Sequence, residues 1–249
     1  MIKQFIIFIV FGIIITIKRT NCNSFVNFIL NFFNTQIKVK GIKNLKDFNN
    51  KRIVIMANHL NGFDYAPIFY ALSHYTKNKK KIYTVAKHNV FGDPTDKNIV
   101  SNSFALIKDQ MFSLLNVIPY ERNNKKSGEI VKKIMLNKID EGDTILLFPE
   151  GKPTRTGIPT EFKPGSFRLC AENEIEILPI TLEFDKKIGI DTTDPIRLEK
   201  WFNLTSTIYI HKPIFDKDWE ILKNKVFDKI RAPLLNKYTY KHKNKLKIK

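Results

Sequence analysis

Two short, continuous apolar runs constrain the fold of this 249-residue chain more than any other feature. Residues 53–57 (Ile-Val-Ile-Met-Ala) and 145–148 (Ile-Leu-Leu-Phe) lack the polar alternation of a strand with one solvent-facing side. Such runs are typical of strands that are buried on both faces, as in a sheet covered by helices on each side. Each run passes directly into a turn-forming segment that contains glycine. Each strand is therefore expected to end in a loop.

Further strand-like and helix-like segments alternate along the chain. Strands are expected near residues 36–39, 82–86, 117–122, 177–180 and 206–211, and helices near residues 65–75, 101–115, 127–139 and 216–230. The spacing in the third of these helices predicts that Ile130, Ile134 and Ile139 face inward. The alternation predicts an α/β fold, with a largely parallel or mixed central sheet flanked by helices, in one domain over residues 35–235.

The N-terminal 34 residues are predicted to form a separate, membrane-associating pair of helices. Residues 5–17 are apolar except for a glycine and a threonine. As a helix this run reaches about 20 Å, less than the roughly 30 Å hydrocarbon core of a bilayer. A small-residue cleavage site is missing after it, which favours a retained membrane anchor over a cleaved signal peptide.

The second helix of this pair has an aromatic face. Its apolar residues recur at helical spacing, and they are Phe25, Phe28, Ile29, Phe32 and Phe33. Two interpretations stay open, since such a face either dips into a membrane or packs on the protein core. The predicted location is the inner, cytoplasmic face of a membrane.

The chain is strongly basic, with a formal net charge of +18. Such a charge attracts nucleic acid or an anionic membrane. A nucleic-acid platform requires aromatic residues interleaved with the basic ones, whereas the N-terminal phenylalanines lie in apolar segments, so nucleic acid is not the expected partner. Residues 236–249 form a lysine-rich tail that either binds an anionic leaflet or is merely solvated.

Neither metal nor disulfide chemistry is indicated. The two cysteines, Cys22 and Cys170, lack metal-ligand spacing, and no His/Asp/Glu cluster suits zinc. Cys170 lies in a predicted helix, where a small buried thiol is favoured over a nucleophile. No metal site and no bound cofactor are predicted.

His59 and Asp64 are candidates for a catalytic pair. His59 follows the strand at residues 53–57, and residues five apart lie on different faces of a helix. Gly62 favours a bent loop that returns the carboxylate to the imidazole. A carboxylate on one ring nitrogen fixes the tautomer and leaves the other nitrogen as a base. The alternative is that Asp64 caps the helix that follows.

Four polar side chains follow strand-like runs directly or end them: His59, Lys87, Arg122 and Glu150. In parallel sheets, ligands collect outside the carboxyl ends of the strands, so a shared site is expected. A bidentate guanidinium at Arg122 suits a phosphomonoester. Lys87 is either a phosphate contact or a surface lysine.

Residues 58–64 (Asn-His-Leu-Asn-Gly-Phe-Asp) and 148–151 (Phe-Pro-Glu-Gly), in this order, resemble the motifs of glycerolipid acyltransferases of the lysophosphatidic acid acyltransferase type. Segments that end at Arg122 and around Pro179 also resemble segments of this family, so the likeness covers roughly residues 40–185. One departure follows Gly151. The family usually reads Thr-Arg-Ser there, whereas this chain reads Lys-Pro-Thr, with an arginine two places beyond the expected one.

The resemblance implies transfer of a fatty acyl group from a thioester, on coenzyme A or acyl carrier protein, to a lysophospholipid hydroxyl. In this interpretation His59 is the general base and Asp64 orients it. Backbone amides of the loop are expected to stabilise the oxyanion. Residues expected to contact the substrate are Asn58, Lys87, Arg122, Glu150, Gly151, Lys152 and Arg155.

The acceptor head group is the open part of this prediction. The resemblance favours 1-acyl-glycerol-3-phosphate, used in phospholipid biosynthesis. The alternatives are a lyso-lipid without a phosphomonoester, or a non-catalytic lipid-binding relative.

Overall fold

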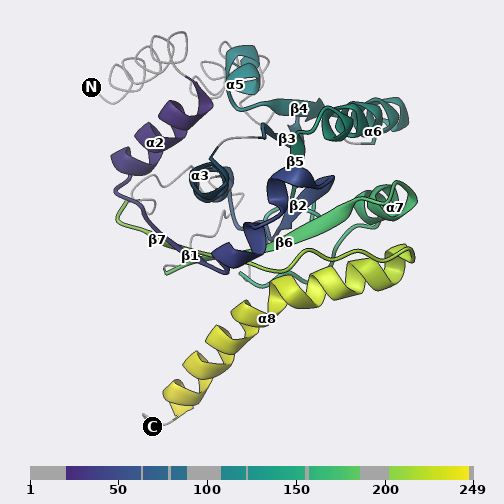
Figure 1. Cartoon of the computed structure of the whole chain (residues 1–249). Coiled ribbons are helices and arrows are strands. Elements are labelled where there is room, and N and C mark those ends of the chain that lie inside the picture. The colour runs from purple at the N-terminus through teal and green to yellow at the C-terminus, as the bar shows by residue number, and fades with distance from the viewer. Residues whose placement is uncertain are drawn as a thin grey trace.

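The computed structural model describes residues 21–62, 64–77, 80–88, 108–121, 123–154, 157–185 and 202–246. Within these residues seven strands form one sheet in the order β1-β7-β6-β2-β5-β3-β4 (Figure 1). The strands are β1 (Gln36–Lys40), β2 (Ile53–Ala57), β3 (Ile82–Lys87), β4 (Val117–Tyr120), β5 (Thr144–Leu147), β6 (Glu176–Phe184) and β7 (Thr205–Ile210).

Five neighbouring strands run in the same direction, namely β6, β2, β5, β3 and β4. The two outer strands are reversed, because β7 pairs antiparallel with β6 and β1 pairs parallel with β7. The sheet is therefore mixed, as one of the two predicted alternatives required. The reversal also places the starts of β1 and β7 at the edge where the five parallel strands end.

Helices cover both faces of the sheet (Figure 1). They are α2 (Cys22–Phe32), α3 (Tyr65–Thr76), α5 (Lys108–Leu114), α6 (Lys125–Asp140), α7 (Gly165–Glu172) and α8 (Trp219–Leu246), with short 3-10 helices η1 (Ile42–Leu45) and η2 (Phe48–Asn50). Side chains of α2 and α3 share one apolar cluster with one face of β2. Side chains of α6, α7 and α8 share a second cluster with the opposite face.

Strand β2 belongs to both clusters. Ile53 and Ile55 lie in the cluster with α3, and Val54 and Met56 lie in the other. Every residue of β2 is buried, which confirms the interpretation of its unbroken apolar run. A strand covered on both faces and paired on both sides leaves only its ends for function.

One predicted helix differs from the structure at its buried face, and another is described only in part. In α6 the buried residues are Val131, Met135 and Ile139, whereas Ile130 is 59% exposed. The predicted face was therefore wrong at Ile130, because Val131 and Met135 sit at equally good helical spacing. Of the helix predicted near residues 101–115, only the part from residue 108 is described, and there it forms α5.

The aromatic face predicted for α2 is partly buried and partly exposed. Phe25, with Val26 and Leu30, is buried, which is the core-packing interpretation. Phe28 and Phe32 are about half exposed, at 48% and 53%. The apolar run at residues 5–17 lies outside the described residues. Across the described part of the chain, none of the helices has the length and apolar character that a transmembrane span requires.

Helix α8 is longer than expected and contains a proline, Pro233. A proline inside a helix interrupts its backbone hydrogen bonds. The Ile230 carbonyl one turn earlier accepts a 2.8 Å hydrogen bond from the hydroxyl of Thr181, which ties α8 to β6. The helix continues through residue 246, so the predicted boundary at 235 falls inside it (Figure 1).

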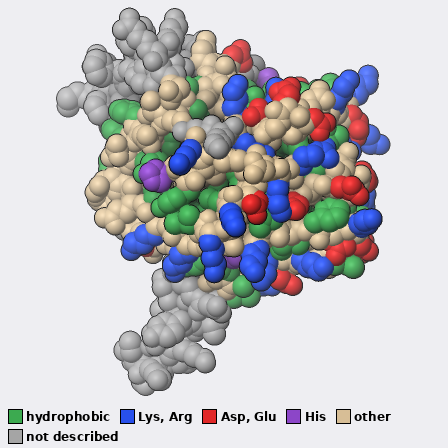
Figure 2. Space-filling model, in the orientation of Figure 1, with side chains coloured by type: hydrophobic (Ala, Val, Ile, Leu, Met, Phe, Trp, Pro, Cys, Tyr) green, Lys and Arg blue, Asp and Glu red, His purple; other side chains and the backbone are tan. Residues whose placement is uncertain are grey.

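The positive charge is distributed rather than focused on the face seen in Figure 2. Lys and Arg side chains there alternate with Asp and Glu over the right half of the view. Basic side chains are thus interrupted by acidic ones in that half, unlike the continuous basic stripe typical of nucleic-acid-binding surfaces.

Candidate active site

The site lies at the edge where the five parallel strands end. Strands β2 and β5 are neighbours in the sheet, so the segments that follow them meet. His59 follows β2, and Glu150 follows β5. Lys87 is the last residue of β3, on the other side of β5. The structure thus brings His59, Glu150 and Lys87 to one edge, as predicted.

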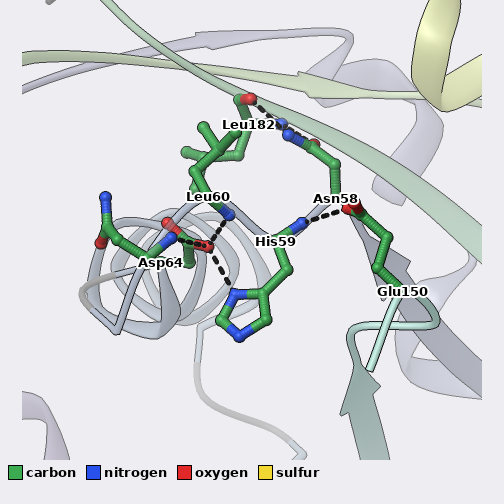
Figure 3. A network of polar contacts seen from close by, with 7 residues as sticks. Asn58, His59, Leu60, Asp64, Glu150 and Leu182 are labelled. Atoms are coloured by element: carbon green, nitrogen blue, oxygen red, sulfur yellow. Dashed lines mark hydrogen bonds and ion pairs between the residues drawn. The ribbon is translucent and has the colours of Figure 1, made fainter. Parts of the chain in front are cut away.

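The loop after β2 is folded around the carboxylate of Asp64 (Figure 3). One carboxylate oxygen, Oδ2, lies 2.8 Å from Nδ1 of His59. The same oxygen accepts hydrogen bonds from the backbone amides of Leu60 and Asn61. Asp64 makes no side-chain cap to α3, so the capping alternative is wrong.

Burial and hydrogen bonds act on Asp64 in opposite directions. Its side chain is 1% exposed, and loss of solvation raises the pKa of the carboxyl above its ordinary value. The contact with His59 and the amides of Leu60 and Asn61 lower the pKa, but by less than burial raises it. Three donors on one oxygen are the arrangement that stabilises a carboxylate anion. An anionic Asp64 can only accept, so Nδ1 of His59 carries the proton.

This tautomer leaves Nε2 of His59 as the basic nitrogen. In Figure 3 the Nε2 side of the ring points away from Asp64. The His59 side chain is 20% exposed, and Nε2 makes no hydrogen bond to any described residue. The ring is stacked on Phe148, with centroids 4.5 Å apart. The imidazole is therefore held on one nitrogen and one face, and no described residue engages the other nitrogen.

Asn58 does not contact the site, which corrects its predicted role in substrate binding. Its side chain is fully buried, and it donates to the carbonyl of Leu182 at 2.9 Å. Its amide oxygen accepts from the Leu182 amide at 2.7 Å. The side chain thereby replaces the backbone pairing between β2 and β6 at the point where β2 ends. Asn58 fixes the start of the His59 loop.

Glu150 holds the same loop from the side of β5. Its carboxylate accepts the backbone N–H of His59 at 2.7 Å (Figure 3). The side chain is 8% exposed, and burial is the main cause that raises its pKa to about 7. The Thr154 amide, four residues on, donates to the carbonyl of His59 at 2.8 Å. Residues 150–154 therefore hydrogen-bond to both the backbone N–H and the carbonyl of His59.

Three amides of the His59 loop are not available to the predicted oxyanion site. The amides of His59, Leu60 and Asn61 already donate to Glu150 or Asp64. An oxyanion hole requires donors that are free to meet the developing charge. These loop amides orient the base instead.

The remaining predicted contacts surround Glu150. Gly151 adopts a left-handed conformation with φ of +68°, which closes the turn after Glu150. Lys152 and Lys87 are exposed, and neither forms an ion pair within the described residues. Arg122 and Arg155 lie outside the residues that the structure describes.

Metal ligation finds no support in the residues described. No group of three or more His, Cys, Asp or Glu side chains there could hold a metal ion. Cys170 is buried and its pKa is raised to about 12, so it is no nucleophile. The chemistry available at this edge is that of a base, His59, held by a carboxylate.

The sequence from β1 to β6 matches a family model. The model described as Acyltransferase matches residues 36–183, more than half of the chain. The chain belongs to the acyltransferase family. This finding confirms the resemblance that the two motifs indicated.

Curated relatives of this acyltransferase are named 1-acyl-sn-glycerol-3-phosphate acyltransferases. The chloroplastic LPAT1 protein of Arabidopsis thaliana is 26% identical over 196 residues, which cover 78% of this chain and 48% of that protein. The protein of Borreliella burgdorferi is 26% identical over 182 residues, 73% of this chain and 62% of its own length. The chain thus spans about half to three-fifths of the length of these relatives.

A solved structure has the same architecture. The crystal structure of the 1-acyl-sn-glycerophosphate acyltransferase PlsC from Thermotoga maritima is 17% identical in sequence and gives a TM-score of 0.58. The match covers 94% of this acyltransferase and 87% of that chain. At this level of identity the likeness concerns the fold, a mixed sheet flanked by helices.

Sequence reasoning missed several residues that build the site in this acyltransferase. Phe148 stacks on His59, Thr154 holds its carbonyl, and Leu182 pairs with Asn58. Phe148 could have been suspected, because it precedes Glu150 in a recognised motif. The other two contribute backbone groups, which leave no signature in side-chain identity.

Proposed function

We propose that this acyltransferase moves a fatty acyl group from a thioester donor to the hydroxyl of 1-acyl-glycerol-3-phosphate. The observation that carries the proposal is the His59–Asp64 pair with Nε2 open, in a chain of the acyltransferase family. The names of the relatives support the choice of acceptor. The donor is an acyl thioester of coenzyme A or of acyl carrier protein.

The reaction follows from the protonation state of the pair. Nε2 of His59 takes the proton of the acceptor hydroxyl as its oxygen attacks the thioester carbonyl carbon. Asp64 stabilises the imidazolium that forms. When the tetrahedral intermediate collapses, the carbon–sulfur bond breaks, and the departing thiolate receives the proton from Nε2. The products are the acyl ester and the free thiol carrier.

The acceptor phosphate is assigned to the cationic side of the site. Lys87 and Lys152 are exposed at the edge that carries His59, and each supplies a point charge. Arg122 and Arg155 are kept as proposed phosphate contacts on the sequence argument alone. Glu150 is proposed to contribute indirectly, by holding His59.

Membrane association is proposed from the reversed outer strands. Because β1 and β7 start at the edge of His59, the segments before them lie there too. Phe28 and Phe32 of α2 and Phe202 before β7 form an exposed aromatic cluster, with the Phe32 and Phe202 rings 5.6 Å apart. Aromatic side chains at that edge suit an interface where a lipid acceptor enters. The cytoplasmic leaflet is the proposed location.

Purified protein, offered a panel of lyso-lipids with each donor, tests the activity. Turnover of 1-acyl-glycerol-3-phosphate above that of a phosphate-free monoacylglycerol is expected. Preference for the phosphate-free lipid would favour the other acceptor class. Binding to vesicles without any turnover would identify a non-catalytic lipid-binding relative.

The membrane proposal has its own test. Phe28→Ser combined with Phe32→Ser should weaken binding to anionic vesicles about tenfold, because two half-exposed aromatic rings are lost while Val26 and Leu30 remain in the core. Ile130→Ser is the matched control, since Ile130 is an exposed apolar residue of α6. Equal vesicle binding by both variants would show that the aromatic cluster does not contribute to membrane association.

A further inference from the structure

Tyr65 follows Asp64 directly and is the first residue of α3. Its hydroxyl donates a 3.1 Å hydrogen bond to the carbonyl of Leu115, the residue after α5. The same hydroxyl lies 3.7 Å from Sγ of Cys22, the first residue of α2. One phenol group therefore connects the starts of α2 and α3 with the end of α5.

The direction of these two hydrogen bonds follows from the groups involved. A carbonyl only accepts, so the single proton of the Tyr65 hydroxyl is used on Leu115. The Cys22 thiol therefore donates to the phenol oxygen. Burial raises the pKa of Tyr65 well above its ordinary value and the pKa of Cys22 to about 11, so both groups keep their protons at neutral pH.

The ring of Tyr65 is held as well as its hydroxyl. It stacks on Phe69, one turn later in α3, with ring centroids 5.3 Å apart. Phe69 is buried in the apolar cluster that α2 and α3 share with β2, and Tyr65, Cys22 and Leu115 pack against that cluster. The phenol hydroxyl is thus a polar contact between helices that otherwise meet through apolar side chains.

Asp64 depends on the start of α3 for its position. Among the described residues, the donors to its Oδ2 all come from its own loop, namely His59, Leu60 and Asn61. Its other oxygen, Oδ1, is buried and accepts no hydrogen bond from a described residue. A displaced first turn of α3 would therefore change the 2.8 Å distance between Oδ2 and Nδ1 of His59.

We propose that the Tyr65 hydroxyl links the placement of α2 to the Asp64–His59 pair, so that Tyr65 is a positioning residue of the reaction. This inference rests on the proposed function. Proton transfer needs an aligned base, so a small displacement of the orienting carboxylate slows the reaction. Phe28 and Phe32, the proposed membrane contacts, belong to α2. Attachment of that helix to a membrane therefore acts on the pair through this link.

The alternative is that apolar packing alone places α3, and that the phenol merely satisfies a buried carbonyl and thiol. Tyr65→Phe keeps the stacked ring and removes both hydrogen bonds. It should lower kcat about tenfold, the range of one hydrogen bond, with the KM of both substrates within twofold of the wild type. The control is Tyr75→Phe, at an exposed tyrosine of the same helix, which should keep the wild-type kcat.

A double mutant tests whether Tyr65 acts through Asp64. In an Asp64→Asn background, Tyr65→Phe should lower kcat less than twofold, because the effects of residues that act as a unit are not additive. A further tenfold loss in that background would contradict the role of Tyr65 as a positioning residue.

Two variants of Cys22 test the connection to α2. Cys22→Ala should lower kcat about threefold, whereas Cys22→Ser, whose hydroxyl still donates to the phenol, should keep most of the activity. Equal kcat for Cys22→Ala and the wild type would overturn the link to α2. These variants also carry the test if Tyr65→Phe does not fold.

A measurement without turnover distinguishes this inference from the proposed function. NMR reports how fast the proton on Nδ1 of His59 exchanges with solvent, and exchange should be about tenfold faster in Tyr65→Phe than in the wild type or Tyr75→Phe. Unchanged exchange overturns the inference and, with turnover by the wild type, leaves the proposed function standing. Faster exchange in Tyr65→Phe, without turnover of any lyso-lipid by the wild type, supports the positioning role and contradicts the acyl transfer.

Discussion

The two parts of the candidate site, the His59 loop and the exposed lysines, differ in how firmly their side chains are held. The proposed base, His59, is held at its amide, its carbonyl, one ring nitrogen and one ring face, by contacts from Glu150, Thr154, Asp64 and Phe148. The cations Lys87 and Lys152 are long, exposed side chains without ion pairs among the described residues. Proton transfer needs a fixed direction, whereas attraction of a phosphate tolerates flexible charges. The well-fixed contacts are therefore concentrated at the proposed base.

Loss of the base should have the largest effect. His59→Ala is expected to lower kcat by about 10²–10⁴-fold, because general base catalysis is removed. Circular dichroism and Tm should stay close to the wild type, since the 20% exposed ring is not a core side chain. A variant that kept near-normal turnover would contradict the proposed mechanism.

Asp64→Asn should separate catalysis from stability. The neutral side chain cannot stabilise the imidazolium, so kcat should fall by about a hundredfold or more. The unfolding free energy should be unchanged or higher, because a buried charge is removed. Measured kcat and denaturant midpoint give both numbers. A large loss of stability would show that Asp64 mainly holds the fold of the loop.

Glu150 should make stability depend on pH. Its pKa is raised from 4.5 to about 7 in the folded chain, so the folded state binds the proton more tightly than the unfolded one. The unfolding free energy contributed by this group is full below about pH 4.5 and falls as the pH rises to about 7, by up to about 3 kcal/mol.

Comparison with Glu150→Gln isolates the contribution of Glu150 ionisation to the unfolding free energy. Glutamine keeps an oxygen for the N–H of His59 but does not titrate. The stability difference between wild type and variant, measured by urea unfolding at several pH values, should grow in favour of glutamine from pH 5 to pH 8. Parallel curves for the two proteins would show that Glu150 titrates at its ordinary pKa.

The smallest effect is expected on the cationic side. Lys87→Met should raise the acceptor KM about three- to tenfold at low salt, since an exposed charge contributes little. The difference should shrink as ionic strength rises, because exposed charges are screened. His59→Ala should show no such salt dependence in kcat. A salt-independent effect of Lys87→Met would show that this lysine is held as firmly as the His59 loop.

Short-range sequence patterns predicted most of the His59 loop and its surroundings. The unbroken run of β2, the spacing of His59 and Asp64 and the strand-end position of Glu150 predicted the base, its orienting carboxylate and the shared edge. They failed for Asn58, because its partner Leu182 is 124 residues away and contributes only backbone groups. The face of α6 was ambiguous, since Ile130 and Val131 both fit a helical stripe.

Other features had no local signal at all. The reversal of β1 and β7 depends on pairing between distant segments, so sequence left a parallel and a mixed sheet equally open. The hydrogen bond from the Thr154 amide to the His59 carbonyl likewise joins segments that are far apart in sequence. Both follow from tertiary contacts alone.

The pairing of β2 has a consequence for the order in which the chain folds. His59 and Asp64 are close in sequence, but Glu150 is 91 residues and Leu182 is 124 residues beyond the residues they hold. During synthesis the base therefore emerges from the ribosome long before its supports. Central strands that wait for distant partners fold slowly and leave apolar surface uncovered. Chains that stop before β6 should accordingly be inactive and prone to aggregate, although they contain both members of the pair.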